Sequence, residues 1–450
     1  MGTQTHERRL NASARRTAAA TTPARSGDGA LEALQTRFFG RVESSVADLR
    51  AFFGDASGRL ATHSLDKTPQ DLYMLLRALH ALLDGWRVVR EERYDRHAPA
   101  LLEYAAIETA PDRFEHVPRE GRQYWLGPDG RRFALDLEFD EDPSGEWSTM
   151  GFVLERSEHR WLLDLLPKLE AWADANHYFR GRAIDLAGKF LKGIDEASWE
   201  DVLLPAELRA AIERNCIGLL SHRELYRANG VPLRRGIILH GPPGTGKTTI
   251  GRALARRCGV TFILATPGMV DEPRTVRRAF EWARRLGPAI LFFEDFDLVA
   301  KNREEGGGSV LGEFLSCLDG VDCSEGIITV VTTNKLSAID PALRNRPNRL
   351  DVVLEVPPLE TSLRGEMLRR WRERSGGSFD EGRWAEKTKG QTGAQLQELL
   401  RCAVVAAVEE AVAAGRAEPA RLGLTDAHLE AAWTKLHPGR ARRIGFHAGE

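Results

Sequence analysis

Short apolar runs alternate with helical segments in the second half of the chain. The runs "GIILHG", "VTFILA", "AILFFED" and "GIITVVTTN" begin at residues 236, 260, 289 and 326. Apolar residues between them follow the three- and four-residue spacing of a helix. This alternation is typical of a parallel sheet with helices on both faces. The pattern predicts an α/β core over residues 196–360.

The chain turns entirely helical after Thr361. Thr392 and Gln395 have the spacing of a capping box ahead of an Ala-rich helix, and Gly415 is a plausible stop for that helix. A last helix is expected to begin near Thr425. We therefore expect a helical domain over residues 361–437 and a short tail over 438–450.

The first part of the chain has a different pattern. Apolar residues recur at helical spacing over 31–107, two strands flank the Pro-Asp-Gly turn at 128–130, and a helix follows over 159–179. Residues 31–195 therefore predict a separate α+β domain, although no chemical motif indicates what it binds. The composition of residues 1–30 favours a disordered tail.

A glycine-rich motif joins the first run of the α/β core to a helix. Gly241, Gly244, Gly246, Lys247 and Thr248 fit G-x-x-x-x-G-K-[ST] between a strand and a helix. Such glycines let backbone N–H groups surround phosphates, and the helix directs its positive end at them. The lysine can reach the β- and γ-phosphates, and the threonine can ligate Mg²⁺. The motif predicts a nucleoside triphosphate site.

A pair of acids ends the apolar run "AILFFED". Glu294 and Asp295 stand where a neighbouring strand tip would supply carboxylates to Mg²⁺ and to an attacking water. A strand ending in acids is often only polar, but a matching phosphate loop lies upstream. The pair is therefore interpreted as part of the same site.

Composition contributes mainly exclusions. The 450 residues carry a formal net charge of −2, so no global field favours nucleic acid or an anionic membrane. The five cysteines are odd in number and include no C-x-x-C, which supports neither a disulfide framework nor a zinc site. The apolar runs are too short to span a bilayer. We expect a cytoplasmic protein without membrane partners.

Several motifs together resemble the AAA-type ATPases of the AAA+ superfamily, over roughly residues 199–436. These motifs match the family in their order and spacing as well as in their residue types. They are "GVPLRRGIILHG", "GPPGTGKTT", "LSCLDGVD" at 315–322, "TTNKLSAIDPALRNRPNRLD" at 332–351 and "GAQLQELL". The resemblance implies a P-loop parallel-sheet module with a helical lid, Mg²⁺-dependent hydrolysis of ATP, and a homo-oligomeric ring, most commonly a hexamer.

The resemblance also implies roles for individual residues. Asn334 would be the first sensor and orient the attacking water, while Arg346 and Arg349 lie in the segment that supplies arginine fingers to a neighbouring subunit. Thr248 and Glu294 would hold Mg²⁺, and Asp295 would polarise water. The nucleotide would contact Gly241, Pro242, Pro243, Gly244, Thr245, Gly246, Lys247, Thr248, Thr249, Val202, Leu203, Gly393 and Ala394.

Three departures from the family pattern bear on these roles. The acids occur as Glu294-Asp295, the reverse of the usual Asp-Glu order, which leaves a slower reaction open. The finger segment is one residue longer than usual, and Asn348 replaces its glycine, so either arginine could be the finger. The loop after the second strand, residues 266–273, is short and has no aromatic residue. We therefore expect no processive threading of unfolded chains.

The predicted function is ATP hydrolysis by an oligomeric AAA ATPase that remodels a protein client through its N-terminal domain. One alternative is a nucleotide-dependent switch or scaffold with little turnover, which the reversed acids keep open. A nucleic-acid motor is less favoured, because no basic patch with interleaved aromatic residues is apparent.

Overall fold

The structure is a computed structural model that describes residues 43–92, 104–118, 120–142, 145–301, 308–319, 326–339, 350–415 and 422–437. The chain divides into two compact units, Met1–His177 and Tyr178–Glu450. The first unit therefore ends before residue 195, where the sequence pattern placed the boundary. Residues after 177 belong to the second unit because β8 (Ala183–Asp185) pairs with its sheet.

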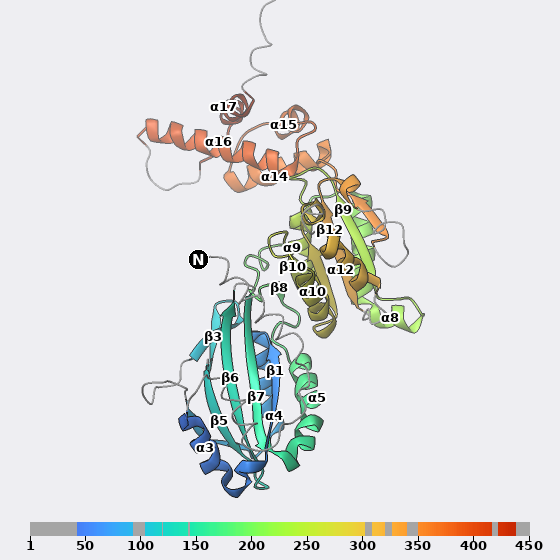
Figure 1. The fold of residues 1–450 in the computed structure, drawn as a ribbon. Helices are drawn as coiled ribbons and strands as arrows, with labels where there is room; N and C mark the ends of the chain where they lie inside the picture. The colour runs from blue at the N-terminus through green and yellow to red at the C-terminus, as the bar shows by residue number, and fades with distance from the viewer. Residues whose placement is uncertain are drawn as a thin grey trace, which may run out of the picture. The chain divides into compact units, whose positions relative to one another are not determined.

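The first unit is built on an antiparallel sheet with the strand order β1-β7-β6-β5-β2 (Figure 1). Helices α4 and α5 pack against each other, and α4 packs on β7 and β1. A separate hairpin joins β3 to β4. The elements are α3 (Glu43–Phe53), β1 (Leu60–Lys67), α4 (Pro69–Leu82), β2 (Arg87–Glu92), β3 (Tyr104–Ala110), β4 (Arg113–Pro118), β5 (Glu120–Leu126), β6 (Arg132–Asp142), β7 (Gly145–Glu155) and α5 (His159–Ala175).

This unit confirms the α+β class and corrects one expectation. The turn at 128–130 does join two strands, because Gly130 adopts φ 84° and Gly127 N donates to Arg131 O at 2.8 Å. The helical expectation over 31–107, however, is wrong at β1, β2 and β3. Strands β1 and β2 form the two edges of the sheet, and their half-exposed residues lack the continuous apolar run that marks an interior strand.

The second unit contains a six-stranded parallel sheet in the order β13-β9-β12-β11-β10-β8. Its interior strands β11 and β12 are buried at every position. Ile290 and Phe292 face one apolar cluster, which includes helix α9, while Leu291 and Phe293 face the cluster of α10 and α12. Helices therefore cover both faces, as the four apolar runs predict.

The elements of the core are α6 (Ala206–Ile212), α7 (Leu219–Ser221), α8 (Arg223–Ala228), β9 (Arg235–His240), α9 (Lys247–Cys258), β10 (Thr261–Ala265), α10 (Pro273–Arg285), β11 (Ala289–Phe293), α11 (Phe296–Lys301), α12 (Gly308–Asp319), β12 (Ile327–Thr333) and β13 (Val352–Glu355).

A helical lid follows the sheet and has an apolar core of its own (Figure 1). Thr392 forms the expected capping box with Gln395, and Gly415 adopts φ 71° just beyond the end of α16. The last helix begins after Thr425, as expected. The lid elements are α14 (Thr361–Ser375), α15 (Glu381–Lys387), α16 (Gly393–Ala413) and α17 (Asp426–Leu436).

Candidate active site

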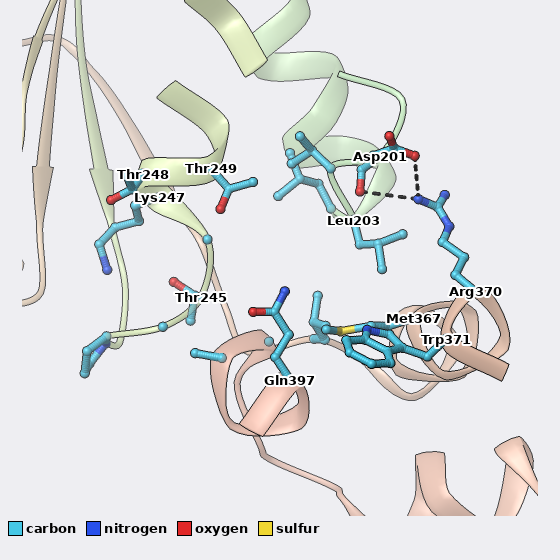
Figure 2. Close-up of a pocket in the computed structure, with 18 of the residues that line it drawn as sticks. Asp201, Leu203, Thr245, Lys247, Thr248, Thr249, Met367, Arg370, Trp371 and Gln397 are labelled. Carbon is cyan, nitrogen blue, oxygen red and sulfur yellow. Dashed lines mark hydrogen bonds and ion pairs between the residues drawn. The ribbon is translucent and has the colours of Figure 1, made fainter. Parts of the chain in front are cut away.

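A cavity of about 870 Å³ lies between the parallel sheet and the lid. Residues 201–204, the phosphate loop, Asp295 and Asn334 of the core form one wall, and helices α14 and α16 form the other (Figure 2). Most residues that the sequence predicts to contact the nucleotide line it. They are Val202, Leu203, Pro243, Gly244, Thr245, Gly246, Lys247, Thr248, Thr249, Asp295, Asn334, Gly393 and Ala394.

The phosphate loop turns tightly between β9 and α9 because glycine is required at its approaches to the rest of the unit. A Cβ at Gly241 would lie 2.1 Å from the backbone oxygen of Val356. Gly244 adopts φ 80°, and its Cβ would lie 2.8 Å from the Cβ of Ala394 in the lid. The first glycine permits close packing of two strand ends, and the second permits close approach of the lid.

Lys247 begins α9, and its side chain is 6% exposed. Its ammonium donates to Gly241 O at 2.7 Å, Pro242 O at 3.0 Å and Asn334 Oδ1 at 2.9 Å. These three contacts use all the donors of an ammonium group. Burial lowers the pKa of Lys247. A phosphate oxygen can therefore reach this ammonium only by replacing one of its present acceptors.

Asp295 and Asn334 meet at the carboxyl edge of the sheet. Asn334 Nδ2 donates to Asp295 Oδ1 at 3.2 Å, so Asn334 bridges Lys247 and the carboxylate. Asp295 adopts φ 42°, an uncommon left-handed conformation for a residue other than glycine. Its N–H donates to Thr332 Oγ1 at 3.0 Å, which holds this conformation. The strained turn places the carboxylate in the cavity.

Two further acids stand beside this pair. Asp297 is buried and accepts from Thr333 Oγ1 at 2.9 Å and from Asn334 N at 3.3 Å, so it fixes the strand end that carries Asn334. Glu294 does not line the cavity. Within the described part of the chain, its buried Oε1 has no hydrogen-bond partner. The sequence pattern did not single out Asp297.

The opposite end of the cavity is apolar. Leu203 packs against the lid core, and Met367 and Trp371 of α14 line the same region. Arg209 holds the segment that carries Leu203, because its guanidinium donates to Val202 O and, at 3.2 Å, to Trp199 O. Leu203, Met367 and Trp371 thus give this end an apolar surface suited to a purine base.

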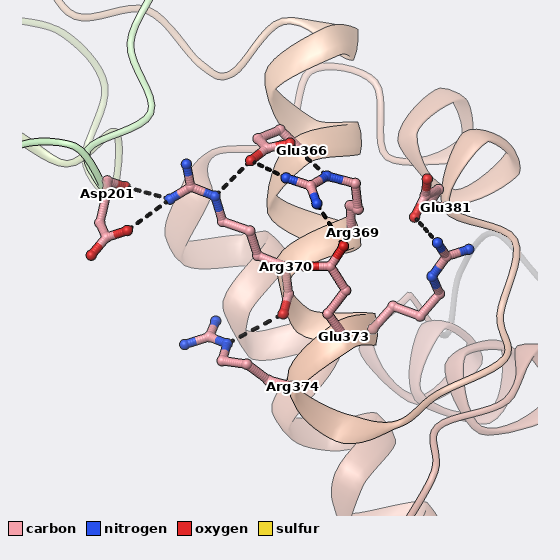
Figure 3. Close-up of polar contacts among 8 residues, drawn as sticks. Asp201, Glu366, Arg369, Arg370, Glu373, Arg374 and Glu381 are labelled. Atoms are coloured by element: carbon pink, nitrogen blue, oxygen red, sulfur yellow. Dashed lines mark hydrogen bonds and ion pairs between the residues drawn. The ribbon is translucent and has the colours of Figure 1, made fainter.

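Charged side chains of α14 connect the lid to the core at this end (Figure 3). Arg370 Nη1 lies 3.1 Å from Asp201 Oδ1, and its Nε donates to Glu366 Oε1 at 2.7 Å. Arg369 also donates to Glu366, at 2.8 Å. Hydrogen bonds from Arg369 and Arg370 lower the pKa of Glu366 to about 2. The carboxylate thus orients Arg370 toward Asp201 across the rim of the cavity.

The N-terminus of α16 contacts the phosphate loop directly. Ala394 N donates to Gly244 O at 3.1 Å. The capping box at Thr392 and Gln395 uses two N–H groups at this helix end, and Thr392 Oγ1 would lie 3.0 Å from a Cβ at Gly244. The lid therefore closes on the loop through one backbone hydrogen bond and a close side-chain approach.

The structure locates the remaining predicted residues away from the cavity surface or does not describe them. Gly241 and Pro242 do not line the cavity, but their carbonyls accept hydrogen bonds from Lys247. Arg346 and Arg349 lie outside the described residues. Sequence reasoning missed Asp201, Met367, Arg370, Trp371 and Gln397, which also line the cavity. Gln397 lies within the segment "GAQLQELL" quoted above, although no role was assigned to it, whereas the other four residues lie outside the quoted motifs. Only the folding of these segments together brings their side chains to one cavity.

The oxygen groups at the phosphate end fit a magnesium ion. Thr248 lines the cavity, and Glu294 has a buried carboxylate oxygen without a partner among the described residues. Mg²⁺ prefers such oxygen ligands and usually retains several waters beside one or two protein groups. The described residues include no group of three or more His, Cys, Asp or Glu able to hold a metal.

Comparison with known families finds a match within the second unit. Residues 237–358 match the family described as "ATPase family associated with various cellular activities (AAA)". The chain carries an AAA domain of the AAA+ superfamily. The matched range contains the phosphate loop, both acids and Asn334.

Known proteins with AAA domains are similar over about half of the chain. A cell division cycle protein 48 homolog of Archaeoglobus fulgidus is 30% identical over 54% of this chain and 36% of its own length. An ATP-dependent zinc metalloprotease FtsH 1 of Symbiobacterium thermophilum is 36% identical, over 46% and 37%. A 26S proteasome regulatory subunit 8 homolog of Schizosaccharomyces pombe is 34% identical, over 42% and 51%.

The chain thus spans about a third to a half of the length of these relatives. Similarity of this extent concerns the AAA domain and leaves the work of the whole protein to be inferred. Among the described helices, none combines the length and apolarity needed to cross a membrane.

Proposed function

We propose that the AAA domain binds ATP with Mg²⁺ and hydrolyses it to ADP and phosphate. The observation that carries this proposal is the continuous polar chain from Lys247 through Asn334 to Asp295, lying in a cavity closed by the lid. These three residues lie just beyond the ends of three neighbouring strands, at the same edge of the sheet. A polar cluster that only stabilised the fold would not need to face a cavity of this size.

The residues of the chain divide the work between binding and water activation. Lys247 exchanges one of its three acceptors for a phosphate oxygen. Asn334 is the acceptor that can rotate away, because the other two are backbone carbonyls of the loop itself. Asp295 then accepts a hydrogen bond from the attacking water, which Asn334 helps to orient. Catalysis thus rests on positioning and electrostatic stabilisation.

A bound magnesium ion would neutralise charge on the phosphate oxygens. Thr248 and Glu294 are the groups that would hold it. Because Asp295 is one methylene shorter than the usual glutamate, slow turnover with tight nucleotide binding is a second candidate behaviour. The protein would then act as a switch or scaffold.

Steady-state release of phosphate separates these two functions. We expect sustained turnover by the intact chain and none by Lys247→Ala, with ATP binding measured in parallel by calorimetry. Tight ATP binding without turnover would favour the switch. Absence of binding in a correctly folded chain would overturn both.

The ring is a further part of the proposal and rests on the resemblance of the finger segment. Arg346 or Arg349 would act on a neighbouring subunit's nucleotide in a homo-oligomer, which we propose to be a hexamer. Mixing a Lys247→Ala subunit with an Arg346→Ala/Arg349→Ala subunit should restore partial activity, since each supplies what the other lacks. Specific activity that stays constant down to a demonstrated monomer would contradict the assignment.

We also propose that the protein remodels a protein client in the cytoplasm and contacts it mainly through the first unit. The loop after β10 supports this, because Val270 is buried and Met269 packs on the sheet core. Its backbone forms a turn, with Met269 N donating to Thr266 O at 2.9 Å. The two apolar candidates for gripping a threaded chain, Met269 and Val270, are thus engaged with the core of the unit.

Client engagement can be tested with hydrolysis-deficient protein as an affinity bait. A client retained by the full chain and lost on deletion of residues 31–165 would support the role of the first unit. ATP-dependent unfolding of a tagged reporter that Met269→Ser abolishes while ATPase activity persists would contradict it.

A further inference from the structure

Gln397 lines the cavity at a place that the predicted nucleotide contacts leave unassigned. It lies on α16 one turn beyond Ala394, which contacts the phosphate loop. Three residues of helix correspond to about 4.5 Å, and residues three apart share a face. Gln397 therefore faces the cavity one helical step farther from the phosphate loop than Ala394.

The side chain lies between the two ends of the cavity. Figure 2 shows Lys247 and Thr248 at one end, and Leu203 and Trp371 at the other. The amide of Gln397 projects into the space between them. Because phosphates occupy the first end and a base fits the second, the sugar must cross the region of Gln397.

The chemistry of the amide matches that of a sugar diol. The carboxamide carries two N–H donors and one carbonyl acceptor, and each ribose hydroxyl both donates and accepts. The amide has no intramolecular hydrogen bond within the described residues, whereas the neighbouring Gln395 is used in the capping box. Its hydrogen-bonding groups are therefore available to a ligand.

We propose that Gln397 recognises the ribose hydroxyls and makes the site selective for ribonucleotides over deoxyribonucleotides. This inference rests on the proposed function, because it specifies the nucleotide that the site prefers. Each deoxy analogue lacks one hydroxyl, and one hydrogen bond contributes about 0.5–1.5 kcal/mol. ATP should therefore bind about 2- to 12-fold more tightly than 2′-deoxy-ATP or 3′-deoxy-ATP.

Calorimetric binding of ATP and of the two deoxy analogues to the full chain tests this selectivity. Gln397→Leu removes the polar groups and keeps a good helix former. It should weaken ATP binding by the selectivity factor while leaving the weaker deoxy analogue unchanged. Glu398→Leu on the same helix, outside the cavity lining, is the matched control and should retain the selectivity.

Gln397→Glu distinguishes a sugar contact from a phosphate contact. A carboxylate can still accept from ribose hydroxyls, so the preference for ATP should persist. If the side chain instead faces a phosphate, this variant should weaken all three nucleotides equally, and the proposal fails.

An unchanged ratio of ATP to deoxy-ATP affinity in Gln397→Leu would also overturn the proposal, while leaving the ATPase function intact. Failure of the wild-type chain to bind any of the three nucleotides would overturn the proposed function itself.

Discussion

The two walls of the cavity are built in different ways. The core wall presents Lys247, Asn334 and Asp295 from the segments that follow β9, β12 and β11, three neighbouring parallel strands. The lid wall presents side chains spaced along two helices, among them Met367, Trp371 and Gln397. The sheet fixes the position of the core wall. The position of the lid wall depends on the contacts between the lid and the core.

This difference assigns different work to the two walls. Groups that must be held within a few tenths of an ångström lie on the sheet, where buried strands leave them little freedom. The side chain proposed to contact the sugar, Gln397, lies on the lid, and Met367 and Trp371 of the lid share the base end with Leu203 of the core. The lid contacts the core through Ala394 N–H and the Asp201–Arg370 pair. Substitutions in the core wall should therefore affect chemistry most, and those in the lid wall should affect selectivity and closure.

The largest expected effect is on hydrolysis through the core wall. Asp295→Asn should retain ATP binding and lower turnover about 10²- to 10⁴-fold, the range expected for loss of a general base. Glu294→Gln is the matched comparison and should instead raise the Mg²⁺ concentration needed for half-maximal activity. Phosphate release measured over a magnesium titration checks both, and exchanged phenotypes would mean that the two acids have the opposite roles.

A second effect on the core wall concerns binding. Lys247→Ala should weaken ATP binding roughly 10- to 160-fold, since a charge-assisted hydrogen bond contributes about 1.5–3 kcal/mol. Calorimetry measures this, and a native circular dichroism spectrum is the control for folding. Unchanged affinity would exclude this loop as the phosphate site.

The junction of the two walls can be tested at two glycines with positive φ. Gly244→Ala would press against Ala394 and Thr392, whereas a Cβ at Gly246, also at positive φ, meets no atom within 4 Å. Both variants carry backbone strain, but only the first carries the clash, which should add about 1–3 kcal/mol of destabilisation. Equal thermal unfolding of the two nucleotide-free variants would show that the lid does not rest on Gly244.

The smallest effect is expected at the rim of the lid wall. Asp201 is 73% exposed and Arg370 31%, so a double-mutant cycle with Asp201→Asn and Arg370→Gln should give a coupling of only about 0.2–1 kcal/mol. The coupling should decline as salt is added. Arg369→Gln, which also removes a bond to Glu366, is the control and should show none with Asp201→Asn. Coupling that is large and insensitive to salt would indicate a buried latch instead.

The sequence by itself determined the core wall. Its apolar runs are buried on both faces of the sheet, and the motif from Gly241 to Thr248 requires a strand before it and a helix after it. Both requirements are local, so contiguous residues are sufficient to predict them. The same is true of the capping box at Thr392, because its contacts span only three residues.

Tertiary structure alone decided the rest. The edge strands β1 and β2 exist because distant strands pair with them, and their own periodicity indicated helix. Asp297 is buried and accepts hydrogen bonds from Thr333 and Asn334 at the end of β12. The residues next to Asp297 in the sequence give no sign of these contacts. Gln397 and Trp371 reach the cavity only because the lid closes on the phosphate loop. Such contacts depend on side chains far apart in the chain, and no local pattern can encode them.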